Sequence, residues 1–473
     1  MNGTLIRELR GVLGADRVLT GATELVLYAR DASNISGSTS VVCLPTSTAE
    51  VQECVRAAVR HGVPFVARGS GTGLAGGAVP LDGAVVIALT KMNQVLSVDV
   101  ENRMAWVEPG VLNLDLTRFT APEGLHFAPD PSSQQSCSIG GNVANNSGGP
   151  HCLADGVTNS HILALEVVLP DGSVTVLGGE DPEPTGYDLR GVFVGSEGML
   201  GITTKVCVRL TQNPPAVRTL LMDFSSVDDG ANTVSAIIAG GILPAALEMM
   251  DRLCIQAVEA FVHAGLPLDA AAVLLVEVTG LPVGLDADVR RVIEIGREHG
   301  ARSVRVAQDE AERLLLWKGR KSAFGAIARI KPNYYLHDTV VPRRRLTEVL
   351  AKVYEIAERH ELLVLNVFHA GDGNLHPLLV FDRREPGTME RVHRAGEEIV
   401  AVSVAVGGVL SGEHGIGLEK RDYMSLMFGP DDLEAQALLR RAFDPLALAN
   451  PMKVLPSPAS CGDVHSVPEG AWI

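Results

Sequence analysis

The chain has 473 residues, 46% of them hydrophobic and 20% charged, which is enough apolar material for two or three domains. Its net charge of −16 repels phosphate backbones, so nucleic acid is excluded as an expected partner. The seven cysteines form no CxxC pair, and no apolar segment reaches the about 20 residues of a membrane span. We therefore expect a cytoplasmic protein without a disulfide framework, an iron–sulfur cluster of its own or a membrane span.

Hydrophobic periodicity predicts the elements of the first 213 residues. Helices are expected over residues 1–20 and from an N-cap at Thr48 to Gly62. Strands are expected at 63–67, 84–89, 95–99, 104–108, 161–169, 174–177 and 202–210, interrupted by three glycine-rich segments. Asn213-Pro214-Pro215 is the clearest boundary in the sequence, so a first domain is predicted over residues 1–213.

Beyond this boundary, strands and long helices alternate. Strands are predicted at 217–224 and 272–278, helices at 226–240, 286–299, 309–329 and 388–405, and a β-hairpin over 362–381. Short helices are expected at 420–427 and 431–442. We therefore predict a second domain over 214–417, helices over 418–456 that return to the first domain, and a mobile tail over 457–473.

The first glycine-rich segment, Gly71-Thr72-Gly73-Leu74-Ala75-Gly76, matches the GxGxxG pattern of dinucleotide-binding Rossmann folds. That pattern must open a helix, and Pro80 leaves no room for one. The alternative is that Arg68-Gly69-Ser70-Gly71-Thr72-Gly73 forms a loop whose backbone N–H groups bind an anion. A plain surface turn is a third possibility.

Two further segments follow, residues 129–149 and 195–202. The three segments, in this order and spacing, resemble the FAD-binding domain of the vanillyl-alcohol oxidase/PCMH flavoprotein family. The resemblance implies that the first holds the pyrophosphate of FAD and that the others line its flavin and adenine halves. It also implies non-covalent binding, because His61 is the only histidine near the first loop. The implied FAD-binding residues are Arg68, Gly69, Ser70, Gly71, Thr72, Gly73, Pro129, Asp130, Ser136, Gly140, Gly141, Asn142, Asn145, Glu197, Gly201, Ile202 and Asn450.

In the second domain, two histidines flank a turn in the segment His369-Ala370-Gly371-Asp372-Gly373-Asn374-Leu375-His376. Asp372-Gly373 is typical of a two-residue hairpin turn, which would place His369 directly opposite His376. Opposed side chains have Cβ atoms about 5 Å apart, so one metal ion could bind both imidazoles. Two unrelated polar residues on an exposed sheet face would also fit the pattern.

A third ligand is available in Ser411-Gly412-Glu413-His414-Gly415-Ile416-Gly417. Two histidines and a glutamate leave coordination positions open, as in catalytic metal sites, and His414 would remain free as an acid or base. An ordinary loop between helices is the alternative.

Both motifs resemble the C-terminal domain of the FAD-linked 2-hydroxy-acid dehydrogenases, a group that includes D-lactate dehydrogenases, the FAD subunit of glycolate oxidase and D-2-hydroxyglutarate dehydrogenase. The resemblance covers residues 40–455. It implies an α+β fold with a PCMH-type two-subdomain FAD-binding domain, a mainly antiparallel substrate domain and C-terminal helices. It implies that His369, His376 and Glu413 bind the metal, that His414 is the base and that Arg320 binds the substrate carboxylate. A solvated helix face is the alternative for Arg320.

These inferences predict FAD-dependent oxidation of a small D-2-hydroxy acid, D-lactate or glycolate, with hydride transfer to flavin N5 and a divalent metal, zinc or manganese. Phe324 and Leu336 favour a small apolar side group in the substrate. Electrons must then pass to a separate acceptor: an iron–sulfur subunit, an electron-transfer flavoprotein, a cytochrome or a quinone. The alternatives are a D-2-hydroxyglutarate dehydrogenase, a non-catalytic FAD-binding subunit of an oxidase complex, a nicotinamide-dependent dehydrogenase and a zinc hydrolase.

Overall fold

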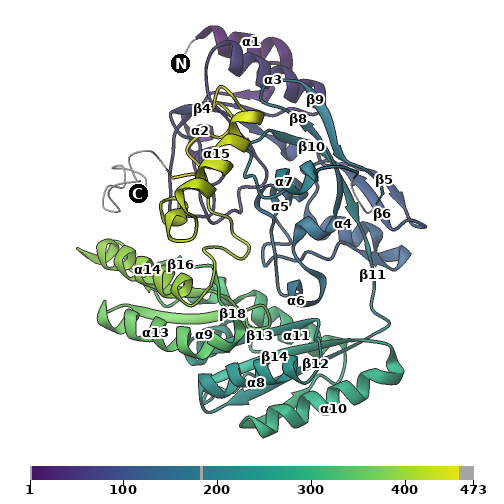
Figure 1. Cartoon of the computed structure of the whole chain (residues 1–473), viewed down its shortest axis with the longest axis vertical. Coiled ribbons are helices and arrows are strands. Elements are labelled where there is room, and N and C mark those ends of the chain that lie inside the picture. The colour runs from purple at the N-terminus through teal and green to yellow at the C-terminus, as the bar shows by residue number, and fades with distance from the viewer. Residues whose placement is uncertain (1–2, 182–184, 457–473) are drawn as a thin grey trace. The chain divides into compact units, whose positions relative to one another are not determined.

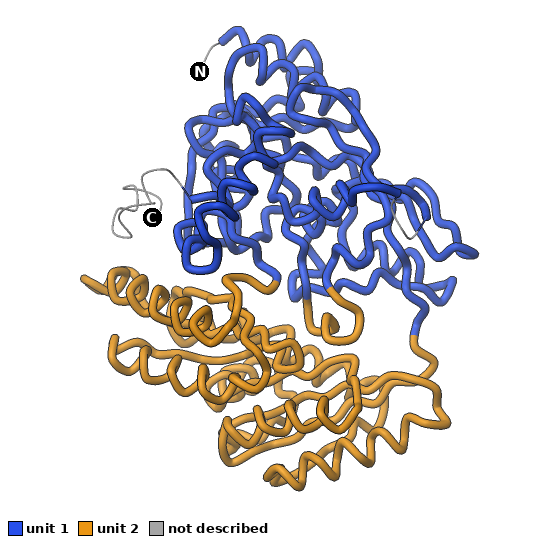
Figure 2. Tube along the Cα trace, in the orientation of Figure 1, with its two compact units in different colours: residues 1–148, 157–213, 413–473 blue, residues 149–156, 214–412 orange. Residues whose placement is uncertain are grey.

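The computed structural model describes residues 3–181 and 185–456. They form two compact units (Figure 2). Unit 1 contains residues 3–148, 157–181, 185–213 and 413–456 of these, and unit 2 contains residues 149–156 and 214–412. The units therefore divide differently from the predicted domains at two places, since residues 149–156 pack in unit 2 and residues 413–417 in unit 1. The predicted tail, 457–473, lies outside the described residues.

Unit 1 begins with a four-stranded sheet in the order β1-β2-β4-β3, in which β2, β4 and β3 run parallel. Helices α1 and α3 lie against this sheet (Figure 1). Helix α3 is capped by Ser47, whose side chain accepts a hydrogen bond from Glu50 N, so the predicted N-cap at Thr48 is one residue late. Its buried side chains, Val51 and Val55 among them, pack on the sheet together with those of α1. The elements are α1 (Gly3–Leu13), β1 (Val18–Leu19), α2 (Ala22–Tyr28), β2 (Thr39–Cys43), α3 (Thr48–Arg60), β3 (Phe65–Arg68) and β4 (Gly83–Ala88).

A five-stranded antiparallel sheet, in the order β5-β6-β10-β8-β9, follows in unit 1. Its core includes Val107, Leu165 and Val206 from the strands and Ile139 and Val143 from α5. The elements are β5 (Val95–Asp99), β6 (Met104–Val107), α4 (Asn113–Thr120), β7 (Leu125–His126), α5 (Ile139–Asn145), β8 (Ile162–Val168), β9 (Val174–Gly178), α7 (Leu189–Phe193), β10 (Ile202–Arg209) and β11 (Thr211–Gln212).

The C-terminal segment also belongs to unit 1. It contains a 3-10 helix (Arg421–Leu426) and α15 (Pro430–Phe443). Residues beyond α15 then join the edge of the first sheet: Phe65 N donates to Leu448 O, and Asn450 N donates to Phe65 O. Residues 448–450 are thereby fixed beside the start of β3.

Unit 2 is built on a nine-stranded antiparallel sheet whose main order is β15-β12-β14-β13-β18-β19-β17, with β20 pairing β18 and β16 pairing β20. Its strands are β12 (Ala216–Phe224), β13 (Ala246–Asp251), β14 (Ala272–Gly280), β15 (Ala301–Val306), β16 (Asn333–Leu336), β17 (Thr339–Val340), β18 (Leu363–His369), β19 (Asn374–Leu375) and β20 (Pro377–Phe381). Its helices are α6 (Cys152–Asp155), α8 (Val227–Ala239), α9 (Arg252–Val262), α10 (Pro282–Glu298), α11 (Glu310–Lys321), α12 (Ala323–Ile327), α13 (Leu346–Arg359) and α14 (Thr388–Ala405).

Apolar side chains on alternate positions of β12, β14 and β13, such as Met222, Leu274 and Met249, form one core with helices α8, α10, α13 and α14. The opposite face of the sheet meets α9, and α11 and α12 pack against α9. The predicted helix over 309–329 is interrupted at Ser322, where α11 ends and α12 begins. No helix of the described chain combines the length and the apolar character needed to cross a membrane.

Candidate functional site

The first glycine-rich segment leaves β3 at Arg68 and reaches β4 without forming a helix. Close packing explains two of its glycines. A Cβ on Gly71, whose φ is +73°, would lie 2.1 Å from Arg68 Nη2, and a Cβ on Gly69 would lie 2.3 Å from Ser138 Oγ. The GxGxxG match therefore does not open a Rossmann helix, in agreement with the argument from Pro80.

Arg68 brings a positive charge to the start of this loop. It is 8% exposed, its Cζ lies 5.5 Å from the centroid of the Tyr28 ring, and its Nη1 has no hydrogen-bond partner among the described residues. Burial lowers the pKa of Arg68, although the Asp31 carboxylate opposes this effect. A desolvated guanidinium with an unused donor, beside a glycine-rich backbone, fits the pyrophosphate of FAD.

The second glycine-rich segment is partly helical, with α5 over Ile139–Asn145, where no helix was predicted. Ser138 caps this helix by accepting a hydrogen bond from Gly141 N. Asn142 is 1% exposed, accepts a hydrogen bond from Asn113 Nδ2 and contacts Cys137 Sγ, so its side chain is used inside unit 1. Packing also explains Gly140, since a Cβ there would lie 2.6 Å from Pro109 Cβ. FAD contacts of Asn142 and Gly140 remain a prediction.

Glu197, in the third segment, ties distant parts of unit 1 together. It is 4% exposed, and its Oε1 accepts hydrogen bonds from Ile416 N at 2.7 Å and Gly417 N at 3.0 Å. Asn450 Nδ2 donates to Glu197 O and to Gly77 O. Burial raises the pKa of Glu197 to about 7 despite the two backbone donors. The implied FAD residue Glu197 is thus the support of the segment that carries His414.

The remaining implied FAD residues of unit 1 lie around these segments. Asn145 Nδ2 donates to His414 O at 2.8 Å, and Pro129 O accepts a hydrogen bond from Asn113 Nδ2. Ser136 Oγ donates to Ser133 O, and Asp130 is buried. Gly201 precedes β10 and Ile202 begins it, and a Cβ on Gly201 would lie 2.7 Å from Val168 O. The sequence does not distinguish such packing roles from cofactor contacts, so the contacts of these residues with FAD also remain predictions.

The histidine hairpin of unit 2 has a different register from the predicted one. His369 pairs with Asn374, not with His376, so residues 370–373 form a four-residue loop in place of the Asp372-Gly373 turn. Contacts outside the hairpin fix this loop, because Gly371 N donates to Leu247 O and β19 pairs with β17. His376 lies two residues beyond the partner of His369 and is therefore its diagonal neighbour on the same face. The two rings still meet, with centroids 4.9 Å apart.

Ligand atoms of His369, His376 and Glu413 all lie within 4.8 Å of one another. Glu413 is bonded directly to Gly412, the last residue of unit 2. That end of unit 2 is fixed by Asp338, which accepts hydrogen bonds from Gly412 N and Ser411 Oγ. Two imidazoles and a carboxylate are a suitable donor set for zinc or manganese. His414 Nε2 lies 3.5 Å from Glu413 Oε1.

Arg320 lies next to the histidines of unit 2, in a network that the sequence did not indicate. Its Nη2 lies 2.6 Å from Glu248 Oε2 and 3.5 Å from His369 Nδ1, and Glu248 Oε1 lies 2.7 Å from the same His369 Nδ1. Arg320 and Glu248 are each 1% exposed. Arg320 Nε and Nη1 have no hydrogen-bond partner within residues 3–181 and 185–456, so donors remain for a substrate carboxylate. The solvated-face alternative for Arg320 is wrong.

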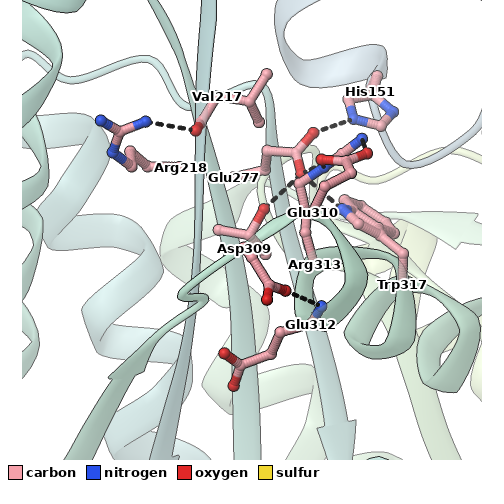
Figure 3. Close-up of polar contacts among 10 residues, drawn as sticks. His151, Val217, Arg218, Glu277, Asp309, Glu310, Glu312, Arg313 and Trp317 are labelled. Carbon is pink, nitrogen blue, oxygen red and sulfur yellow. Dashed lines mark hydrogen bonds and ion pairs between the residues drawn. The ribbon is translucent and has the colours of Figure 1, made fainter.

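A second buried carboxylate, Glu277 on β14, is surrounded by polar side chains that include His151, Arg313 and Trp317 (Figure 3). Its Oε2 accepts hydrogen bonds from Trp317 Nε1 at 2.6 Å, Thr219 Oγ1 at 2.7 Å and Arg313 Nη1 at 3.0 Å. His151 Nε2 lies 3.3 Å from its Oε1. Although burial alone would raise it, the pKa of Glu277 is lowered to about 2, chiefly by His151 and with help from Thr219 and Trp317.

The sequence argument missed both Glu248 and Glu277. Each is a carboxylate with apolar neighbours on both sides inside a strand, in Ala246–Asp251 and Ala272–Gly280, and that pattern was the available signal. The predicted substrate contacts Phe324 and Leu336 lie on α12 and β16 of unit 2, where Leu336 is buried and Phe324 half-buried. Their contact with a substrate remains a prediction.

Comparison with known proteins adds to this geometry. Residues 213–454 match the family model of FAD linked oxidases, C-terminal domain, and residues 39–178 match that of the FAD binding domain. Glycolate oxidase subunit GlcD of Escherichia coli (strain K12) is 46% identical over 89% of this chain and 85% of its own length. GlcD of Bacillus subtilis (strain 168) is 39% identical over 91% of this chain and 92% of its own length. A probable mitochondrial D-lactate dehydrogenase of Danio rerio is 32% identical over 95% of this chain and 91% of its own length.

Two solved structures share the fold at low sequence identity. 4-Ethylphenol oxidase from Gulosibacter chungangensis has a TM-score of 0.80 at 20% identity, covering 96% of this chain and 98% of its own. p-Cresol methylhydroxylase has a TM-score of 0.78 at 18% identity, covering 95% of both chains. The predicted α+β fold of the PCMH type is therefore confirmed.

Proposed function

The chain belongs to the FAD-linked 2-hydroxy-acid oxidases and dehydrogenases, and from that premise we propose that its substrate is glycolate or D-lactate. It is an FAD-dependent oxidoreductase that acts on the CH–OH group of 2-hydroxy acids. The finer assignment is supported by the relatives named for glycolate oxidase and D-lactate dehydrogenase. It is carried by one observation, the buried Arg320 with unused donors beside His369.

Arg320 accounts for selection of the carboxylate. A buried guanidinium with donors that face no protein acceptor is unfavourable unless a ligand uses them, so an anionic ligand is favoured there. We assign the substrate carboxylate to this position. The apolar Phe324 and Leu336 then favour hydrogen or methyl over a second carboxylate as the side group, which distinguishes glycolate and D-lactate from D-2-hydroxyglutarate.

The chemistry divides among a few residues. Arg320 holds the carboxylate and orients the substrate Cα, and His414 accepts the proton of the substrate hydroxyl at an imidazole nitrogen. Bound FAD supplies the hydride acceptor. A zinc or manganese ion held by His369, His376 and Glu413 would supply a Lewis acid that lowers the pKa of the hydroxyl. Glu197 and Asn145 keep the main chain of the His414 segment in place.

The oxidation requires an electron acceptor besides FAD. The chain has no CxxC pair to hold an iron–sulfur cluster, so we propose that electrons leave to a separate protein or small-molecule acceptor. The names of the GlcD relatives describe them as subunits, which supports a protein partner for this chain.

An anaerobic titration of the purified protein with glycolate, D-lactate, L-lactate and D-2-hydroxyglutarate, with and without prior chelation, tests the proposal. We expect glycolate or D-lactate to bleach the flavin band at about 450 nm. After chelation, neither acid should bleach it. Fastest bleaching by D-2-hydroxyglutarate would replace the substrate assignment. If chelation does not change the bleaching, the metal has no role in the reaction. A yellow protein that no acid bleaches would favour a non-catalytic FAD subunit.

A further inference from the structure

A row of polar side chains crosses four neighbouring strands of the unit 2 sheet. Thr219 on β12 pairs with Glu277 on β14, and Glu248 on β13 pairs with His369 on β18. Glu277 pairs with Ala246, which is two residues before Glu248, so the two pairs point to the same face. The row is opposite to the apolar face that packs on α8, α10, α13 and α14.

Helix α11 lies over this row and presents a matching set of donors. Arg313, Trp317 and Arg320 are spaced by four and three residues, so they share one face of the helix. Arg313 and Trp317 donate hydrogen bonds to Glu277, whereas Arg320 forms an ion pair with Glu248. The two carboxylates therefore fix one helix, but only Glu248 also contacts a candidate metal ligand.

Glu248 uses its two oxygens for two different partners, His369 Nδ1 through Oε1 and Arg320 Nη2 through Oε2. His369 Nδ1 faces the Glu248 carboxylate at 2.7 Å, which leaves Nε2 as the ring nitrogen that can bind a metal. Carboxylates that accept from a ligand histidine orient the ring and raise its basicity.

We propose that Glu248 is the positioning residue that couples the metal site to the carboxylate-binding site, by fixing the His369 ring and the Arg320 guanidinium with one carboxylate. The inference rests on the proposed function, because it takes His369 as a ligand and Arg320 as the substrate-binding residue. A glutamine has only one acceptor oxygen, so it cannot serve both donors, and its amide group would face one of them.

The test compares E248Q with E277Q in the FAD-loaded full chain. Both variants replace a buried carboxylate that bonds α11 from the same face of the sheet, but only E248Q touches His369. Zinc and manganese affinities are measured by chelator competition, and KM and kcat are measured for the preferred acid. Flavin content and the thermal midpoint report folding.

We expect E248Q to retain FAD, to bind the metal roughly 10–100-fold more weakly and to raise KM, while the metal affinity of E277Q stays close to that of the unchanged protein. Unchanged metal affinity and KM in folded E248Q would overturn the inference. Equal weakening in both variants would also overturn it, because general loosening of α11 would then explain the effect.

If E248Q does not hold FAD, E248D takes its place. The shorter carboxylate keeps the charge but cannot reach both partners, so we expect a folded protein that loses metal affinity, KM or both. A folded E248D with both values intact would contradict the proposal. An unchanged protein that binds neither metal would end the metal assignment of the proposed function, whereas a metal-binding protein insensitive to E248Q or E248D ends only this inference.

Discussion

Two buried glutamates, one in each unit, have opposite pKa shifts. Glu197 in unit 1 accepts hydrogen bonds from two backbone N–H groups, and burial raises its pKa to about 7. Glu277 in unit 2 is bonded by Arg313, Thr219 and Trp317 and lies next to His151, and its pKa is lowered to about 2. Burial by itself raises the pKa of both carboxylates. The groups that face each carboxylate therefore decide whether its pKa ends above or below the ordinary value.

The same contrast describes the candidate residues of each unit taken separately. In unit 1, glycines, main-chain groups and neutral amides form the segments near Arg68, Glu197 and His414. In unit 2, charged side chains meet across a sheet and a helix, as at Glu248 and Arg320. Substitutions that add a Cβ atom should therefore perturb the segments of unit 1 most. Substitutions that change a charge should perturb the contacts of unit 2 most.

The largest effect is expected for His414, which lies on the segment whose main chain is bonded by Glu197 and Asn145. In H414A, the rate of flavin reduction by glycolate or D-lactate should fall about 10²–10⁴-fold, because the base is lost. FAD content should be retained, because Glu197 and Asn145 hold that segment through its main chain. Anaerobic stopped-flow absorbance measures the rate. A near-normal rate would remove His414 from the mechanism.

The next largest effect is the pH dependence of stability in the FAD-free chain. An unfolded glutamate titrates near about 4.3, so between that pH and about 7 the folded state keeps a proton on Glu197 that the unfolded state has lost. Stability should therefore fall as pH rises through this window, by on the order of 3 kcal/mol. E197Q should remove the slope, as measured by urea unfolding at pH 5, 6 and 7.

E277Q should behave in the opposite way. The lowered pKa of Glu277 stabilises the folded state above about pH 4.3, and this stabilisation is lost as the pH falls towards about 2. E277Q should therefore be destabilised at neutral pH and should lose less stability than the unchanged protein on acidification. Similar pH profiles for E197Q and E277Q would contradict the contrast between the two carboxylates.

A smaller effect is expected when the positive charge at position 320 is kept but the planar guanidinium is replaced. R320K should lower kcat/KM by about 10–100-fold, because a lysine cannot donate to Glu248 and to a substrate carboxylate with the geometry of a guanidinium. R313K is the matched control, since Arg313 lies on the same helix and bonds Glu277. Steady-state kinetics with the preferred acid measure kcat/KM for both variants. Equal losses in both variants would mean that helix packing, and not carboxylate binding, is affected.

The smallest effect compares two glycines of the first loop. G71A should destabilise the FAD-free chain by about 1–2 kcal/mol, because its φ is +73° and the new Cβ would meet Arg68. G73A should be nearly neutral, since the nearest atoms to a Cβ there are 3.8 Å away. Chemical unfolding measures both variants. A G73A loss as large as that of G71A would contradict the packing argument.

The sequence by itself determined the parts that are local. It predicted the alternation of strands and helices beyond Pro214, the absence of a Rossmann helix after the first glycine loop, the family and the FAD cofactor. These follow because hydrophobic periodicity, proline and contiguous glycine motifs act over a few residues. It also predicted that His369 and His376 approach each other, although through a turn that does not form.

The tertiary structure decided what depends on residues far apart in the chain. The hairpin register was set by contacts of Gly371 and β19 with other strands, because an Asp-Gly pair specifies a turn only where nothing outside the hairpin competes. The strand that carries Glu248 was not predicted, and no spacing in the sequence relates it to Arg320 or His369. Carboxylates can be buried in apolar strands only where a fold brings donors to them, and those donors here come from another helix and another strand.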